Sequence, residues 1–286
     1  MLNYSDHIKP TSGFTLVELS IVLVIIGLVA GGILAGRDLV ETAKMRAQLT
    51  QIEKYNTAVH DFQTKYLVKP GDMALTTASQ YGFNTVGCDG TMGNRDGNGI
   101  LDGYWAGIRI LEYREVTLFW QDLSQEGLID GSYPGGGATY SSGCGIASAN
   151  WTLTSGATYI GNYIPAAKIG SGNFVYVYDS ATNAGGVDDD NWFGIGAITS
   201  VHTDGSMYSN ATITPLSAFR IDQKVDDGVP TTGNVRALYI NSYWINQPNA
   251  QASDSATSCY NTTTNIYSIS YNKGSAQACA LSIKFQ

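Results

Sequence analysis

The chain has 286 residues, long enough to bury a core, and its composition is uneven. Glycine (33 residues) and tyrosine (18 residues) are abundant and charged residues make up only 14% of the chain, which is typical of a protein rich in strands and loops. The formal net charge of -8 argues against nucleic acid as a main partner, because phosphate binding needs clustered Lys and Arg. Neither a nucleophile motif nor a paired acid site accompanies the few histidines, so we expect no enzyme.

The first predicted element is an apolar segment near the N-terminus. Leu19 to Gly36 (LSIVLVIIGLVAGGILAG) holds no charged residue over 18 positions, just enough to cross a bilayer core of about 30 Å. A secretory signal peptide would have a shorter apolar core, followed by a cleavage site of small residues. Here the run continues past the weak candidate site Ala30-Gly31-Gly32. We therefore predict a transmembrane segment over about residues 16–36.

The residues before this segment include a lone carboxylate. The stretch Gly13-Phe14-Thr15-Leu16-Val17-Glu18 places Glu18 at the edge of the membrane span. A charge at that depth costs about 2.5–3.5 kcal/mol, so an unpaired carboxylate there needs a role. Cleavage after Gly13 would free an α-amino group on Phe14. That amine is a natural counter-ion for the Glu18 carboxylate of a neighbouring chain.

The segment GFTLVELSIVLVIIGL resembles the N-terminus of type IV pilins and type II secretion pseudopilins. The resemblance implies that prepilin peptidase cuts between Gly13 and Phe14, removes residues 1–13 as a leader and N-methylates Phe14. It also implies that Glu18 guides insertion of the subunit into a growing filament. The leader departs from the usual basic pattern of the family, because it contains Asp6 as well as Lys9.

The same resemblance implies where the protein resides and what it contacts. It implies a precursor in the bacterial inner membrane that crosses once, with its head in the periplasm, and a mature form in a periplasmic or cell-surface filament. The implied partners are prepilin peptidase, other pilin or pseudopilin subunits, the inner-membrane assembly platform and membrane lipid. The expected function is a structural subunit of a type IV pilus-like or type II secretion pseudopilus filament. The alternative is a minor or tip pilin whose head acts as an adhesin or binds carbohydrate.

Beyond the apolar segment the pattern predicts that the helix continues, giving one helix over residues 14–66. Apolar residues recur at spacings of three and four and form one stripe of an amphipathic helix: Met45, Leu49, Ile52, Tyr55, Val59, Phe62 and Tyr66. The residues expected on the opposite, polar side are Lys44, Gln48, Gln51, Lys54 and Asp61. No proline occurs from Phe14 to Lys69, and Pro70-Gly71-Asp72 predicts the stop.

Residues 67–286 are predicted to form a globular, β-rich head. Runs of β-branched and aromatic residues predict strands at 174–178, 192–199, 235–244, 266–271 and 281–285. The segment EVTLFWQDLSQEG (115–127) predicts a short helix. The expected fold class is α+β and pilin-like: a long N-terminal helix, half transmembrane and half amphipathic, packed on a mainly antiparallel β-sheet. Several head segments, among them Phe119-Trp120-Gln121-Asp122-Leu123, also resemble a bacterial group of large prepilin-type proteins.

One loop of the head has oxygen-bearing residues at alternate positions, as in an EF-hand calcium loop. The candidate ligands are Asn94, Asp96, Asn98, the backbone carbonyl of Ile100, and Asp102. Trp105 stands where such a loop has its bidentate glutamate, and Glu112 or Glu115 would have to fold back to supply that ligand. Major pseudopilins carry a structural calcium site in the head, so the resemblance favours a structural Ca²⁺. The alternative is an Asn/Asp/Gly-rich turn that holds no metal.

The four cysteines all lie in the predicted head, and their even number suggests disulfides in an oxidising compartment. Three pairings are available. We favour Cys259 with Cys279, because a hairpin between them would bring its ends together and many type IV pilins have a disulfide-bounded loop at this place. Cys88 with Cys144 then follows by elimination.

Overall fold

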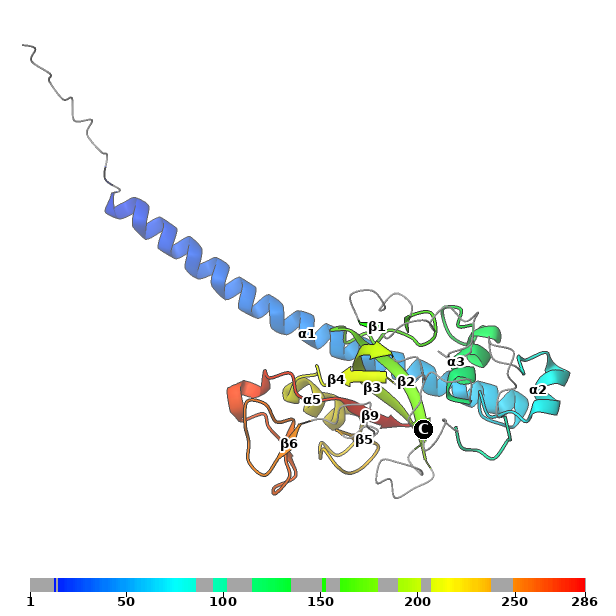
Figure 1. The fold of residues 1–286 in the computed structure, drawn as a ribbon. Coiled ribbons are helices and arrows are strands. Elements are labelled where there is room, and N and C mark those ends of the chain that lie inside the picture. Colours follow the sequence, from blue (N-terminus) through cyan, green and yellow to red (C-terminus); the bar gives the residue numbers. More distant parts are fainter. Residues whose placement is uncertain are drawn as a thin grey trace, which may run out of the picture. The chain divides into compact units, whose positions relative to one another are not determined.

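We describe the protein from a computed structural model of the chain. The structure describes residues 13, 15–85, 95–101, 115–134, 151–152, 160–179, 190–201, 207–237 and 249–285. The chain divides into two compact units, Met1–Ala43 and Lys44–Gln286, and each is described by itself. Helix α1 (Leu16–Tyr66) runs through the boundary between them (Figure 1).

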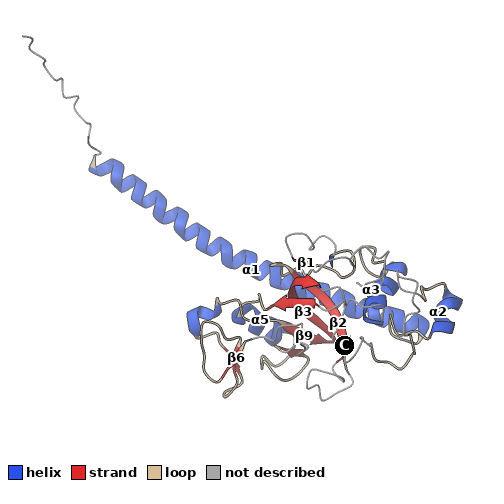
Figure 2. Cartoon of the chain, in the orientation of Figure 1, coloured by secondary structure: helices blue, strands red, loops and turns tan. Residues whose placement is uncertain are grey.

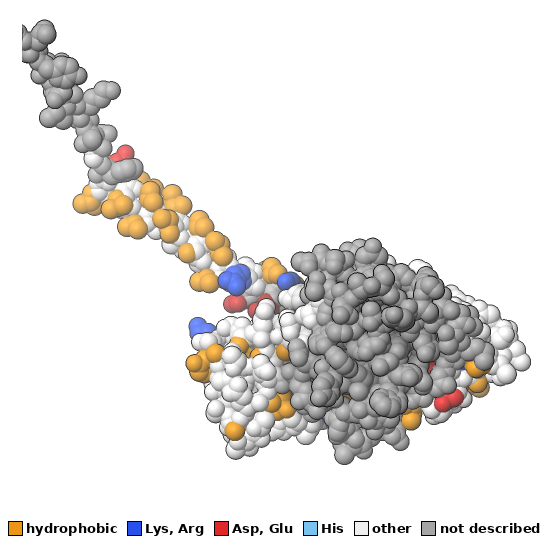
Figure 3. Space-filling view, in the orientation of Figure 1, with side chains coloured by type: hydrophobic (Ala, Val, Ile, Leu, Met, Phe, Trp, Pro, Cys, Tyr) orange, Lys and Arg blue, Asp and Glu red, His pale blue; other side chains and the backbone are white. Residues whose placement is uncertain are grey.

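The first unit consists, in its described part, of Gly13, Thr15 and the N-terminal part of α1. The most apolar 18-residue window of this helix has a mean hydropathy of 2.6, and none of that window is buried. Figure 3 shows the corresponding side chains as a nearly continuous apolar surface. By length and composition, α1 is therefore apolar enough to cross a membrane.

The second unit begins at Lys44, in the middle of the predicted helix. The part of α1 that follows Lys44 belongs to this unit and forms one side of its core. The predicted apolar stripe is confirmed: five of its seven members are buried, and Leu49 and Tyr66 are partly buried against them. Two expected polar residues were placed on the wrong face. Gln48 and Gln51 are buried, and their Oε1 atoms accept the backbone N–H groups of Ile169 and Lys168, each at 3.0 Å. Burial is tolerated because these amides satisfy the backbone of a neighbouring segment.

Within the described residues, the main sheet of this unit has six strands, and every pairing in it is antiparallel (Figures 1 and 2). Its central strand β3 (Asn191–Val201) pairs with β1 (Trp151–Thr152), β2 (Asn173–Asp179), β4 (Met207–Asn210) and β9 (Leu281–Lys284), and β5 (Val235–Arg236) pairs with β9. The predicted strands at 174–178, 192–199 and 281–285 are found within about a residue or two. Of the predicted strand 235–244, residues 238–244 lie outside the described part of the chain.

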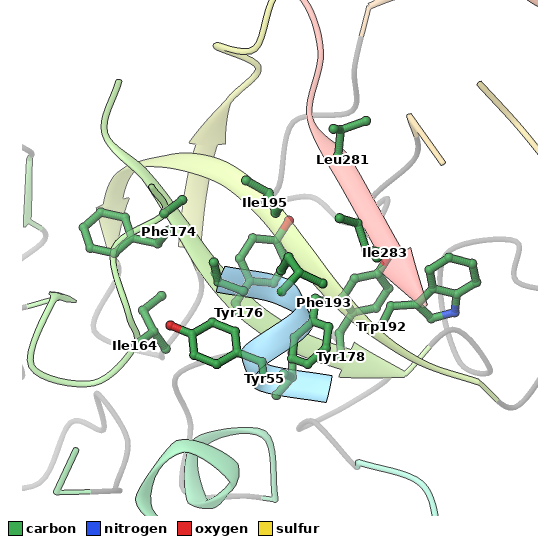
Figure 4. Packing of buried hydrophobic residues seen from close by; sticks show 14 of the residues in the cluster. Tyr55, Ile164, Phe174, Tyr176, Tyr178, Trp192, Phe193, Ile195, Leu281 and Ile283 are labelled. Atoms are coloured by element: carbon green, nitrogen blue, oxygen red, sulfur yellow. The ribbon is translucent and has the colours of Figure 1, made fainter. Parts of the chain in front are cut away.

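Both faces of the sheet are covered at its centre, since every residue of β2 from Asn173 to Tyr178 is buried. Side chains of α1 and of α3 (Glu115–Gln125) cover one face, where the ring of Phe193 lies 6.0 Å from that of Tyr55 and 6.3 Å from that of Trp120. Figure 4 shows Tyr55 of α1 lying against these strands. Because both faces of the central strands are buried, their sequences are unbroken runs of mainly apolar residues.

Gly194 of β3 lies directly against an aromatic ring of this core. A Cβ at Gly194 would come within 2.0 Å of the Tyr176 ring. Only glycine therefore leaves room for that ring against β3.

The remaining elements were predicted less well. Helix α3 confirms the predicted helix at 115–127, but α2 (Leu75–Tyr81) and α5 (Pro215–Val225) were not predicted. The predicted strand at 266–271 was wrong beyond Tyr267. Strand β8 (Ile266–Tyr267) ends there and is followed by a 3-10 turn, η1 (Tyr271–Gly274), in which Asn272 and Lys273 have positive φ. Strand β8 belongs to a small second sheet, in the order β6 (Ala250–Gln251), β7 (Tyr260–Asn261), β8.

Candidate functional site

The N-terminal end of α1 is capped reciprocally by Thr15 and Glu18. The Glu18 N–H donates to Thr15 Oγ1 at 3.2 Å, and the Thr15 N–H donates to Glu18 Oε2 at 2.8 Å. The Thr15 hydroxyl also donates to Glu18 Oε2 at 2.8 Å. This is the Thr-x-x-Glu capping box, which satisfies N–H groups that a helix start leaves open. The lone carboxylate of the predicted span therefore has a local structural role as well.

The predicted cleavage position lies immediately before this cap. Gly13 is exposed, and a Cβ built on it would meet no atom within 4 Å. Phe14 lies outside the described residues. A substitution at Gly13 would thus meet no steric obstacle in the described structure.

The second candidate site is built around Asp72, in the turn that follows α1. Its Oδ2 accepts the Gly99 N–H at 2.8 Å, which attaches the turn to the loop 95–101. One carboxylate oxygen each of Asp72, Asp96 and Glu115 lie within 4.8 Å of one another. Three chain segments that are separate in sequence therefore bring their carboxylates together.

A buried ion pair holds this region in place. The guanidinium of Arg95 donates to both carboxylate oxygens of Asp122, at 2.6 and 2.8 Å, and both side chains are fully buried. The same carboxylate accepts the Gly71 N–H at 2.7 Å. Gly71 has φ +86°, and a Cβ on it would lie 2.4 Å from the carbonyl oxygen of Glu115. The turn after α1 and the first turn of α3 therefore meet backbone to backbone, which only glycine permits.

The loop is also fixed to the sheet through Asn191, the first residue of β3. The Leu101 N–H donates to Asn191 Oδ1 at 2.8 Å, and Asn191 Nδ2 donates to the Gly99 carbonyl at 3.0 Å. Lys69 Nζ donates to the same carbonyl at 2.6 Å. The loop 95–101 is thus held at its middle and at its end.

The predicted calcium ligands are only partly brought together. Asp96 is in the carboxylate cluster, whereas Asn98 bonds inside the loop: its N–H and Nδ2 donate to Asp96, and its Oδ1 accepts the Ile100 N–H at 2.6 Å. Asn94 and Asp102 lie outside the described residues. Of the two glutamates considered for the loop, Glu112 lies outside the described residues. Glu115 does reach the loop, and its Oε1 accepts the Asp96 N–H at 3.1 Å.

Asp72 was missed as a site residue. In the sequence it is only the last residue of a helix stop, and no spacing rule relates it to Asp96. In the structure, burial raises the pKa of its carboxyl group, and the nearby Asp96 raises it further. Burial likewise lowers the pKa of Lys69. Both shifts follow from charged groups being held in a poorly solvated place.

The sulfur atoms of Cys259 and Cys279 are bonded to each other, which is the pairing that we favoured from the sequence. Cys88 and Cys144 lie outside the described residues, and their pairing stays a prediction. Trp120 and Trp192 are buried in the core, so these two side chains offer no exposed surface on which a carbohydrate could stack.

Comparison with known proteins bears on the N-terminal site. Residues 8–34 match the family model described as "Prokaryotic N-terminal methylation motif". This motif is the signature of type IV pilins and pseudopilins, and here it coincides with the start of the long apolar helix. The match spans the N-terminal segment only. No curated protein and no solved structure matched the chain.

Proposed function

We propose that the chain is a structural subunit of a type IV pilus-like or type II secretion pseudopilus filament. The observation that carries the proposal is the methylation motif at residues 8–34, placed at the start of an apolar helix whose 18-residue window is wholly exposed. Prepilin peptidase would cut between Gly13 and Phe14, and the mature chain would enter the filament from the membrane through α1. The precursor is then membrane-anchored, with its head in the periplasm.

Glu18 has the central role in this proposal. In the single chain its carboxylate is bound by Thr15 alone among the described contacts, through two bonds to the same oxygen, Oε2. Cleavage would place an α-amino group next to Thr15, and a neighbouring subunit would present the same group. A carboxylate in hydrocarbon costs about 2.5–3.5 kcal/mol when unpaired. Pairing with an amine removes that cost, so the charge favours the assembled state.

The test separates the charge of Glu18 from its capping role. Glu18→Gln keeps a residue that suits a capping box but removes the charge, whereas Thr15→Val removes the capping hydroxyl and keeps the charge. Each variant is expressed as the full chain in the producing cells, and its amounts in membranes and in sheared fibres are compared. Glu18→Gln should remain in the membrane but fall in fibres by more than about tenfold, since about 1.4 kcal/mol is a factor of ten. Thr15→Val should still enter fibres.

The opposite result would contradict the proposed role of the charge. If Glu18→Gln entered fibres at the wild-type level while Thr15→Val did not, Glu18 would act as a helix cap. If the wild-type chain were never found in fibres, the filament proposal itself would fail. Cleavage after Gly13 in every variant would show that the difference arises after processing.

A further inference from the structure

A lysine and an asparagine from distant parts of the chain meet at one backbone oxygen of the second unit. The Gly99 carbonyl accepts Lys69 Nζ at 2.6 Å and Asn191 Nδ2 at 3.0 Å. Lys69 lies just after α1, and Asn191 is the first residue of β3, the central strand of the main sheet. Because both nitrogen atoms contact the same oxygen, the amine of Lys69 lies beside the side-chain amide of Asn191.

The Asn191 side chain is held in one orientation. Its Oδ1 accepts the Leu101 N–H at 2.8 Å, while its Nδ2 donates to the Gly99 carbonyl. A backbone donor at one end and a backbone acceptor at the other leave only this orientation of the amide. Asn191 and Leu101 are both buried. The Leu101 N–H draws electrons from the Asn191 Cγ–Oδ1 bond, and it would stabilise negative charge on Oδ1 if a nucleophile added to Cγ.

The amine of Lys69 is partly buried beside this amide. Burial lowers the pKa of Lys69, although the charges of Asp72 and Asp190 oppose the shift. A larger fraction of the amine is therefore neutral, which is the form that attacks a carbonyl carbon. A lysine amine is carried on a flexible four-carbon stem, so rotation about its bonds moves Nζ from the Gly99 oxygen to the neighbouring Cγ of Asn191.

Asp72 supplies a carboxylate at the same place. It is only 1% exposed, and its Oδ2 accepts the Gly99 N–H at 2.8 Å. Within the described part of the chain, its Oδ1 is buried and has no hydrogen-bond partner. Such an atom is rare in native proteins and is often explained by a reactive role. Asp72 and Lys69 thus bind the N–H and the carbonyl of one residue, Gly99, and Asp72 Oδ1 is available to receive a proton.

We propose that Lys69 and Asn191 form an intramolecular isopeptide bond in the folded protein. The neutral Nζ adds to Asn191 Cγ and a C–N bond forms, while the Leu101 N–H binds the charge that develops on Oδ1. Asp72 Oδ1 takes one proton from Nζ and passes it to Nδ2. The Cγ–Nδ2 bond then breaks and ammonia leaves. Atoms and protons balance, and no electrons are gained or lost.

The fold is what makes this reaction possible. An amine and an amide react very slowly in solution, and holding the two groups together in a fixed geometry supplies most of the missing rate. The bond would join the end of α1 to the central strand of the main sheet. It goes beyond the proposed filament function and does not depend on it, because it concerns the second unit alone.

The first test is the intact mass of the full-length chain, purified from membranes in detergent and then reduced and denatured. The wild-type chain should be lighter, by the mass of one ammonia, than its sequence predicts from its measured N-terminus. Tryptic digestion should recover residues 66–95 joined to residues 169–220. Because the chain has been reduced, a disulfide cannot account for this branched peptide. A full mass, with the two peptides recovered separately, would overturn the proposal.

Lys69→Arg is the matched variant. The guanidinium keeps the positive charge and the N–H donors for the Gly99 carbonyl, but it stays protonated and does not attack a carbonyl carbon. This variant should have the full mass. Its melting temperature should be lower than that of the wild type by about 10 °C, because it lacks a cross-link that closes a long loop.

Asp72→Asn tests the proton transfer. This variant keeps the shape of the side chain and an oxygen for the Gly99 N–H, but it removes the carboxylate. The rate at which newly folded chains lose ammonia should fall by about a hundredfold or more. An unchanged rate would overturn the role given to Asp72.

The control is Lys284→Arg. Lys284 pairs with Asp190, the residue before Asn191, so it is another lysine close to Asn191 in the described part of the chain. Joining should be complete in this variant, as in the wild type. Loss of the branched peptide in Lys284→Arg, together with its retention in Lys69→Arg, would overturn the assignment of Lys69.

Discussion

Asp222 shows how a single buried carboxyl group can make the stability of the head depend on pH. It lies on α5 and is fully buried, where its Oδ2 accepts the Tyr267 hydroxyl at 2.8 Å and its Oδ1 accepts the Gly228 N–H at 3.0 Å. Burial, together with smaller contributions from the neighbouring Asp227 and Asp226, raises its pKa to about 6. The Asp222 carboxyl group therefore links α5 to β8 through its hydrogen bond with Tyr267. Its burial makes it harder to ionise than an exposed aspartate.

We expect wild-type stability to fall as pH rises from about 4 to about 6, because of this residue. The folded pKa lies above the ordinary value of 3.8, so the folded state holds the proton more tightly. The stability that the protonated Asp222 carboxyl group contributes is fully present below about pH 4, and it is lost as pH rises through about 6. Asp222→Asn cannot ionise. Urea unfolding of both chains over this range should show the wild type losing stability relative to the variant, with no further change above it.

Tyr267→Phe provides the control for this pH effect. The Tyr267 hydroxyl stabilises the ionised carboxylate and so lowers its pKa. Its removal should extend the decline to higher pH, because the folded pKa rises while the unfolded pKa is unchanged. Parallel stability curves for the wild type and Asp222→Asn between pH 4 and pH 6 would contradict the assignment to Asp222.

At the scale of elements, the disulfide joins the two sheets of the head. Cys259 lies directly before β7 of the small sheet, and its carbonyl accepts the Ser268 N–H at 2.9 Å. Cys279 lies two residues before β9 and exchanges backbone hydrogen bonds with Ile213, at 2.9 and 3.0 Å. Both cysteines are fully buried. The bond therefore holds a short sheet, which would be weak alone, to the strand next to the centre of the main sheet.

Cys279→Ser should lower the free energy of unfolding by about 3 kcal/mol, because closing a loop of this size restricts the unfolded chain by about that amount. The two cysteines are 20 positions apart. The measurement is urea unfolding of the full-length chain in detergent. Cys259→Ser is the matched control and should have a similar effect, and the double variant should add little. Peptide mapping without reductant checks the pairing directly, and recovery of Cys259 linked to Cys88 or Cys144 would refute it.

The whole molecule is expected to exist as a processed chain. The methylation motif at residues 8–34 predicts a mature N-terminus at Phe14, carrying a methyl group. Gly13→Val should block cleavage while leaving the fold intact, because a Cβ at Gly13 meets no atom within 4 Å. Intact-mass measurement of the wild-type protein and of Gly13→Val, each taken from membranes, shows whether residues 1–13 have been removed. A wild-type chain that begins at Met1, or after Ala30, would contradict processing at this site.

Local patterns predicted much of this architecture. An unbroken apolar run without proline predicts α1, the stripe from Met45 to Tyr66 predicts its buried face, and alternation from Leu281 to Phe285 predicts β9. Helix α5 also has a local signal that we did not use: Thr214 caps it through the Ser217 N–H, and Pro215 follows. Each of these signals lies within one or two helical turns, or within a single strand, where neighbours in sequence are neighbours in space.

The tertiary structure decided what depends on distant segments. Gln48 and Gln51 are polar residues at positions that a periodicity rule assigns to solvent, and they are buried because backbone N–H groups 121 and 117 residues away need their oxygens. In the carboxylate cluster, Asp96 has a recognisable motif, but Asp72 and Glu115 reach it only through the packing of Gly71 on α3. The helix, its charge at Glu18 and the processing motif follow from neighbouring residues alone, because all three act locally. The carboxylate cluster of the head depends on the fold, because only chain topology sets the distance between residues far apart in sequence.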